Sequence, residues 1–142
     1  MQFHITKESD KAAVKYINNE LYQYNLKHFP EDLRGRYKEI NLFVRDENDH
    51  VCGGLIGEIC WNWLEIQILM VNENLRKSGL GTKLLLEAEQ VARDNQCDFI
   101  KLDTLSFQAL DFYQKHGYEV YGSIDNVGRE HKHYYLKKDL VF

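Results

Sequence analysis

Apolar side chains recur along the chain in patterns that predict alternating strands and helices. Residues 64–71 form an almost continuous apolar run, which is typical of a buried strand. Beyond residue 79 apolar side chains return every three or four positions, which predicts a long amphipathic helix that covers a sheet. The β-rich run at residues 97–104 then predicts a second strand, parallel to the first and joined to it by a right-handed crossover.

The chain before this unit is expected to start with a short strand at residues 2–6 and a helix capped by Ser9. Apolar side chains of that helix share one face, so the helix is expected to lie on a sheet. They are Ala13, Ile17, Leu21 and Tyr24. Pro30 opens a second, short helical segment through about residue 38, with Tyr37 turned inward.

Further strands are expected on both sides of the crossover. Residues 40–46 and 51–60 alternate and predict an antiparallel hairpin. After the crossover, Ser106 is placed to cap a helix that Gly117 ends in the left-handed conformation. Residues 118–124 and 133–140 predict two closing strands, which also allow a homodimer to form through them.

Composition narrows the class of protein. With 142 residues and 44% apolar content, residues 1–142 are expected to form a single domain. A net charge of −4 argues against a nucleic-acid partner and favours a neutral or cationic one. Three cysteines without paired spacing and a polar start predict a reduced, cytoplasmic protein, and no apolar run is long enough for a membrane span.

The junction between the apolar run and the long helix is a candidate anion site. Residues 76–81 read Arg-Lys-Ser-Gly-Leu-Gly, so free backbone N–H groups and the positive end of the helix dipole meet there. A nucleotide-hydrolase phosphate loop needs a different spacing before its Gly-Lys-Ser/Thr. The dinucleotide fingerprint needs a small residue where this chain has Leu84.

Two motifs resemble those of the GNAT superfamily of N-acetyltransferases. The first is Leu69-Met70-Val71 followed by Arg76-x-x-Gly79-x-Gly81, and the second is Ser106-x-x-Ala109-x-x-Phe112-Tyr113-x-x-x-Gly117-Tyr118. The resemblance implies one α/β domain with a mixed, mostly antiparallel sheet of about six or seven strands and about four helices. It also implies a V-shaped cleft for coenzyme A between the strands that end at Val71 and Thr104.

The same resemblance implies which residues bind acetyl-coenzyme A, the expected co-substrate. Loop amides and basic side chains would hold its pyrophosphate, and only glycine would let the backbone approach closely. The strand end would pair with its pantetheine arm, and the second motif would complete the site. The residues concerned are Leu69, Met70, Val71, Arg76, Lys77, Ser78, Gly79, Leu80, Gly81, Thr82, Ser106, Ala109, Phe112 and Tyr113. No metal site is predicted, since His131 and His133 lack a third ligand with suitable spacing.

Acetyl transfer to an amine needs a proton acceptor and a proton donor. Glu65 lies eleven residues before Arg76, at the position of the glutamate base in the histone acetyltransferase branch of the family. Strict alternation would put Glu65, Gln67 and Leu69 on one face of the strand. Either Glu65 is the base, or it is paired with a basic side chain and an ordered water relays the proton. Tyr113 matches the family's general acid, and a backbone N–H near Val71 would stabilise the oxyanion.

The function that these residues imply is transfer of acetyl from acetyl-coenzyme A to a primary amine. Attack would be direct, without a covalent enzyme intermediate. Acidic residues and tryptophans near the strand favour a small cationic acceptor. An amine of a protein or peptide is the next alternative. Two other classes stay open, namely a module that senses coenzyme A without turnover and a small nucleotide-phosphate binder.

Overall fold

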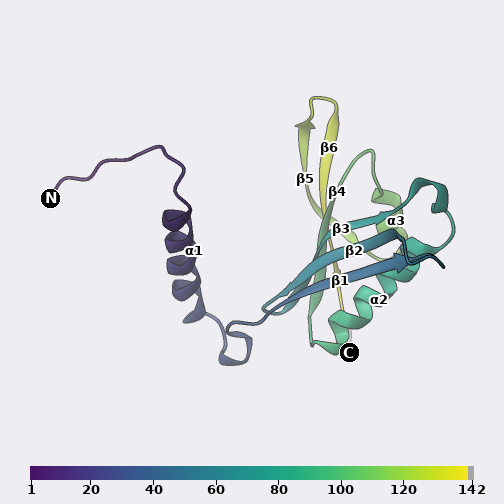
Figure 1. Cartoon of the computed structure of the whole chain (residues 1–142), viewed down its shortest axis with the longest axis horizontal. Coiled ribbons are helices and arrows are strands. Elements are labelled where there is room, and N and C mark those ends of the chain that lie inside the picture. The colour runs from purple at the N-terminus through teal and green to yellow at the C-terminus, as the bar shows by residue number, and fades with distance from the viewer. Residues whose placement is uncertain (141–142) are drawn as a thin grey trace. The chain divides into compact units, whose positions relative to one another are not determined.

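A computed structural model describes residues 1–140 and divides the chain into two compact units, Met1–Gly35 and Arg36–Phe142 (Figure 1). The first unit holds helix α1 (Lys11–Leu26) and a single 3-10 turn, η1 (Glu31–Leu33). The expected strand at residues 2–6 is wrong, because that segment pairs with no other strand in the described chain. Asp10, not Ser9, caps α1 by accepting from the Ala13 N–H at 3.1 Å.

The segment after Pro30 is shorter than expected. Its helical conformation ends after three residues, because Arg34 is extended and Gly35 has a φ of +70°. The prediction of a helix to about residue 38 is therefore wrong. Tyr37 begins a strand, and its side chain is exposed instead of inward.

The second unit is built on a six-stranded sheet in the order β1-β2-β3-β4-β6-β5. Only β3 and β4 run parallel, so the mixed, mostly antiparallel sheet expected from the sequence is confirmed. The elements in chain order are β1 (Tyr37–Arg45), β2 (Val51–Cys60), β3 (Trp63–Val71), η2 (Glu73–Leu75), α2 (Leu80–Asp94), β4 (Phe99–Leu105), α3 (Leu110–Lys115), β5 (Glu119–Val127) and β6 (His131–Asp139).

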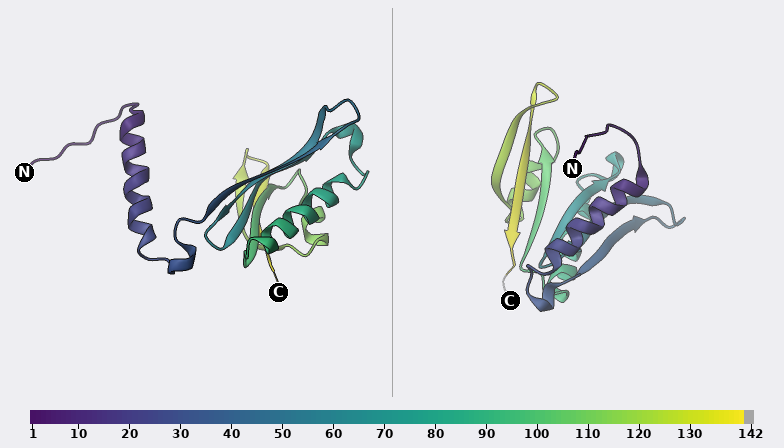
Figure 2. Two further views of the ribbon diagram at one scale, coloured as in Figure 1. Left: turned by 60° about the horizontal axis from the view of Figure 1, so that its bottom comes forward. Right: turned by 90° about the vertical axis from the view of Figure 1, so that its left-hand side faces the viewer.

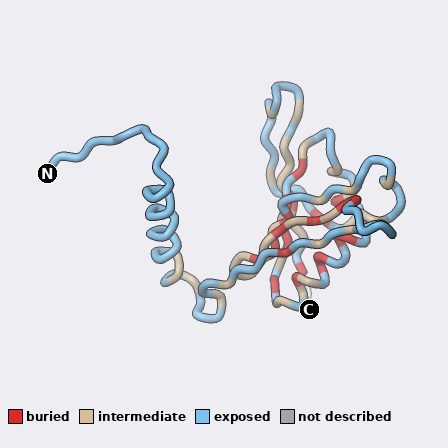
Figure 3. The backbone as a smooth tube through the Cα atoms, viewed as in Figure 1, coloured by how far each residue is buried: buried red, intermediate tan, exposed pale blue. Residues whose placement is uncertain are grey.

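Helix α2 lies along one face of the sheet and buries its apolar stripe there (Figure 2). Leu85 and Ala88 of α2 are fully buried, as are Ile100 of β4 and Leu136 of β6. The buried positions concentrate in the central strands and α2 (Figure 3). Burial of each large aliphatic side chain contributes about 1.5–3 kcal/mol, so this layer supplies most of the stability of the second unit.

A β-bulge interrupts the alternation of β3. Ile56 pairs with Ile68 but Gly57 pairs with Ile66, which leaves Gln67 as an extra residue on β3. A Cβ on Gly57 would collide with the carbonyl oxygen of Glu65, so glycine is required opposite the bulge. The strict alternation predicted for residues 64–70 is therefore wrong.

Beyond the bulge the alternation of β3 is shifted by one residue, so odd-numbered positions face the core in place of even-numbered ones. Leu64 and Ile66 are buried before it, whereas Leu69 and Val71 pack against the core after it. Ile68 and Met70 are then about half exposed on the opposite face. The bulge thus turns the end of β3 so that consecutive side chains line a space beside the sheet.

Strands β3 and β4 pair over four residues and then separate. Trp63–Ile66 is in register with Phe99–Leu102, and no pairing between the two strands follows. Beyond that point β3 runs on to Val71 and β4 to Leu105. The V between these two strands, expected from the family resemblance, is present.

Candidate active site

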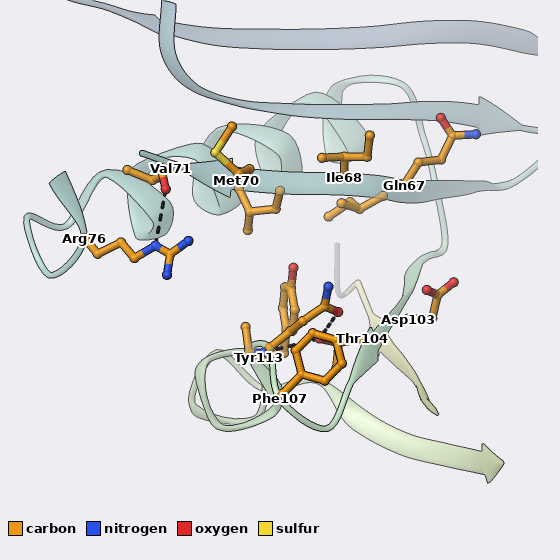
Figure 4. A pocket seen from close by; sticks show the side chains of 13 residues that line it. Gln67, Ile68, Met70, Val71, Arg76, Asp103, Thr104, Phe107 and Tyr113 are labelled. Atoms are coloured by element: carbon orange, nitrogen blue, oxygen red, sulfur yellow. Dashed lines mark hydrogen bonds between the residues drawn. The ribbon is translucent and has the colours of Figure 1, made fainter. Parts of the chain in front are cut away.

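The V between β3 and β4 is a cleft of about 650 Å³ (Figure 4). One wall is β3 from Ile66 to Val71, and the other is formed by the end of β4 and the start of α3. A neighbouring cavity of about 260 Å³ continues toward the start of α2 and shares five lining residues with the first. These are Leu69, Val71, Arg76, Ala109 and Tyr113.

The loop at the start of α2 presents unpaired backbone donors. None of the N–H groups from Ser78 to Thr82 donates to an acceptor in residues 1–140, and the first bond to the helix is from Lys83 N–H to Gly79 O at 3.1 Å. The Ser78 hydroxyl is instead used to cap the carbonyl of Leu75. Donors of this kind at a helix N-terminus suit a diphosphate, so the loop fits the group expected there.

The two glycines of the loop have different roles. Gly79 has a φ of +87° and open space where a Cβ would stand, so its backbone conformation is the reason for glycine. Gly81 borders the smaller cavity, and a Cβ there would only touch the Phe112 ring at 3.5 Å. A larger side chain at position 81 would therefore project into the space next to Phe112.

Two basic residues precede these glycines. Arg76 lines both cavities, and its Nε donates to the Val71 carbonyl at 3.4 Å, which holds the guanidinium at the end of β3 (Figure 4). Lys77 lines the smaller cavity with a φ of +68°. Positive charge therefore lies beside the free amides, as an anion site requires.

Tyr113 stands between the two cavities with its hydroxyl turned toward β3 (Figure 4). Its side chain is 6% exposed and packs edge-on against Phe112 and Tyr118. Burial, with a smaller contribution from the charge of Asp103, raises the pKa of Tyr113 to about 12. The phenol therefore keeps its proton at any physiological pH.

The turn before α3 differs from the expectation at Ser106. The hydroxyl of Ser106 accepts from Lys132 N–H at 3.1 Å, so it joins β4 to β6 and does not cap the helix. Ala109 is the residue before α3, and its N–H donates to Thr104 Oγ1 at 3.3 Å. The prediction of a Ser106 cap is wrong, because this hydroxyl accepts from the backbone of the neighbouring strand β6 instead. Ser106 also lines neither cavity.

Glu65 lies outside the lining of both cavities. Its carboxylate is 3.7 Å from Lys101 Nζ on β4, and each of the two side chains is 35% exposed. The same ammonium lies 4.9 Å from the centre of the Trp63 ring. Glu65 is therefore paired with a basic side chain, which was the second of the two alternatives for this residue.

Four polar residues that line the cleft were not among the predicted site residues, namely Gln67, Asp103, Thr104 and Gln108. Gln108 Oε1 accepts from Leu105 N–H at 2.7 Å, which fixes its amide group beside the cavity. Asp103 could have been found from the sequence, because it is a charged residue inside an otherwise mainly apolar strand.

Residues 1–140 bring together no group of three histidine, cysteine or acidic side chains able to hold a metal ion. None of the helices in this part of the chain combines the length and apolar character that a membrane span needs.

Known proteins are similar to this chain in sequence and in fold. The model of the acetyltransferase (GNAT) family matches residues 11–118. Acetyltransferase Atu2258 of Agrobacterium fabrum is 35% identical over 124 residues, which cover 87% of this chain and 88% of that protein. Blasticidin-S acetyltransferase of Streptomyces morookaense is 39% identical over 79 residues, covering 55% and 58% of the two proteins.

A solved structure agrees over nearly the whole chain. The crystal structure of an acetyltransferase from Bacillus cereus matches with a TM-score of 0.91 at 33% identity, covering 96% of this chain and 98% of that one. These similarities confirm the resemblance carried by the two motifs. The chain therefore belongs to the acetyltransferase (GNAT) family, whose enzymes use acetyl-coenzyme A as acetyl donor.

Proposed function

We propose that this acetyltransferase transfers the acetyl group to a primary amine of a small cationic molecule, by direct attack of the nitrogen. The observation that carries the proposal is the cleft between β3 and β4, with free loop amides at one end and Tyr113 in its wall. A nucleophile that enters the V would meet an acyl group bound there.

The chain's own residues would hold the donor along this cleft. The amides of Ser78 to Thr82 would bind its diphosphate, with Arg76 and Lys77 adding positive charge. Past Ile66 the edge of β3 is not paired with β4, so its main chain is free to bond the amides of the pantetheine arm. A backbone N–H near Val71 would stabilise the negative charge that develops on the carbonyl oxygen.

Proton transfer would involve both walls of the cleft. Tyr113 retains its proton and can donate it as the thiolate leaves, since its hydroxyl turns toward the space that the thioester would occupy (Figure 4). The attacking nitrogen must lose a proton, and Glu65 or an ordered water would accept it. The pairing of Glu65 with Lys101 favours the relayed water.

Direct attack is supported by the position of the thiols. Neither cavity is lined by any of the three cysteines, all of which lie in the described part of the chain. Burial, followed by the charge of Glu58, raises the pKa of Cys60 to about 11, and burial also raises that of Cys97. Thiols that stay protonated are poor nucleophiles, so acylation of a cysteine is not expected.

A small cationic acceptor is supported by the charge of the chain and by one relative. The net charge is −4, and the Streptomyces relative is a blasticidin-S acetyltransferase, which acts on an antibiotic. An amine of a protein or peptide is the second candidate.

The test is thiol release from acetyl-coenzyme A over a panel of small amines, peptides and aminated antibiotics. We expect turnover with at least one small cationic amine and little with peptides. Tight binding of coenzyme A without thiol release on any member of the panel would instead support a sensor module.

A further inference from the structure

Asp103 extends from β4 into the cleft, and the proton transfers proposed above do not use it (Figure 4). Its neighbour Leu102 is 3% exposed and belongs to the core that α2 covers. Because side chains alternate along a strand, Asp103 points to the opposite face of the sheet. It lines the same cleft as Tyr113, so a molecule that enters the V can meet both side chains.

A second residue holds this carboxylate in place. His133 Nε2 on β6 lies 2.9 Å from Asp103 Oδ1, and the Tyr135 hydroxyl lies 3.3 Å from His133 Nδ1. The side chain of His133 is 26% exposed, whereas that of Asp103 is 50% exposed. The carboxylate is thus held through one oxygen, and its other oxygen has no hydrogen-bond partner in residues 1–140.

Glu65 is a second carboxylate on the same face of the sheet, but it is already paired. Register pairs Glu65 with Lys101, two residues before Asp103 on β4, and the Lys101 ammonium already neutralises Glu65. Asp103 has no lysine or arginine partner in residues 1–140, and it lines the cavity. Of the two carboxylates, Asp103 is the one available to an incoming cation.

We propose that Asp103 is the acceptor-binding carboxylate of the cleft, oriented by His133, and that it selects acceptors with a second positively charged nitrogen. The proposal rests on the amine acetyltransferase function proposed above. An ion pair with a carboxylate stabilises the charged form of an amine, whereas the reacting nitrogen must be neutral to attack. In this proposal Asp103 therefore binds a cationic group other than the nitrogen that is acetylated.

The test compares 1,4-diaminobutane with 1-aminobutane, which has the same carbon chain and one charge fewer. Binding of each amine to the protein loaded with coenzyme A is measured by calorimetry, and acetyl transfer is measured separately by thiol release. We expect the wild-type protein to prefer the diamine at least tenfold. Asp103→Asn should abolish that preference and leave the KM for acetyl-coenzyme A within about twofold.

Three further variants separate recognition from stability. Asp103→Glu keeps the charge and should retain the preference for the diamine. His133→Gln should weaken it without changing the KM for acetyl-coenzyme A, since His133 only orients the carboxylate. Asp139→Asn is the matched control, because Asp139 is an exposed β6 carboxylate that pairs with Lys137 and lines neither cavity.

The outcomes separate this inference from the proposed function. Equal diamine binding by wild type and Asp103→Asn would overturn the inference even if acetyl transfer occurs. Diamine binding that depends on Asp103, without thiol release on any amine of the panel, would support the inference and overturn the proposed function. A wild-type protein that neither binds nor acetylates the diamine in preference to the monoamine also overturns the inference.

Discussion

Tyr113 combines deep burial with a position in the wall of the cleft, and its removal gives the most direct test of catalysis. Tyr113→Phe should lower kcat by about 100-fold, as expected for loss of a general acid, and change the KM for acetyl-coenzyme A little. Initial rates of thiol release measure both. Tyr134→Phe is the control, since Tyr134 packs against the core but lines neither cavity. An unchanged kcat in Tyr113→Phe would contradict the assigned role.

The raised pKa of Tyr113 also predicts how stability depends on pH. In the unfolded chain a tyrosine ionises near its ordinary pKa of about 10, while the folded protein holds the proton of Tyr113 up to about 12. Its contribution is therefore complete below pH 10 and is lost as pH rises toward 12. The wild-type protein should lose about 1.4 kcal/mol relative to Tyr113→Phe between pH 9 and pH 11, about half of the loss over the whole window. Urea unfolding at pH 9, 10 and 11 measures the difference, and parallel curves would refute it.

Single residues differ in how far their sequence context reveals their role. Arg76 and Tyr113 line the cleft and Gly79 lies in the loop before α2, and each belongs to a motif of fixed local spacing that singled it out in the sequence. Asp103 was missed, since its importance depends on where β3 leaves β4 and on His133, thirty positions away in the chain. Distant partners of this kind leave no local pattern.

At the scale of elements, the loop and first turn of α2 act as one anion-binding unit. A valine at position 81 would press on the Phe112 ring and narrow the smaller cavity. Gly81→Val should therefore raise the KM for acetyl-coenzyme A at least about tenfold, with a smaller effect on kcat. Gly122→Val is the matched control, since a Cβ on Gly122 meets nothing within 4 Å. Equal KM values in the two variants would remove the loop from the binding site.

A buried carboxylate joins α2 to the last strands. Glu89 is 2% exposed, accepts from the Tyr118 hydroxyl at 3.0 Å, and pairs with Lys138 Nζ of β6 at 3.0 Å. Its removal leaves the ammonium and the hydroxyl without their partner. Glu89→Ala should therefore cost about 3 kcal/mol of unfolding free energy.

Urea unfolding checks this value, with Glu87→Ala as control because Glu87 is exposed on the same helix. A loss no larger than that of the control would mean that hydration of Lys138, which is 25% exposed, compensates for the missing carboxylate.

Elements with strong periodicity were predicted well, and irregular ones were not. Strand β2 matches its predicted bounds, and β3 differs by one residue. The bulge at Gln67 was missed because it depends on a glycine of the facing strand. The helix after Pro30 was overestimated, since three residues of local preference do not outweigh the extended backbone that β1 imposes from Tyr37 onward.

At the scale of the whole molecule, the buried core of the described chain lies entirely in the second unit. Every buried residue lies between Ile40 and Leu140, within the second unit. In the first unit α1 has no buried side chain, and Ile17 and Leu21 are 63% and 58% exposed. A helix of 16 residues is marginal in water unless a surface covers its apolar stripe.

The sequence predicts that this stripe lies on the sheet, and a paired substitution tests it. If the stripe is covered, replacing Ile17 and Leu21 together by serine should lower the free energy of unfolding by about 3 kcal/mol. Asn18→Ser is the control, because it introduces serine at an exposed polar position of the same helix. Urea unfolding curves of the two variants measure the difference. If both stay within about 0.5 kcal/mol of the wild type, α1 contributes nothing to folding, and the expectation of one domain from residue 1 to 142 fails with it.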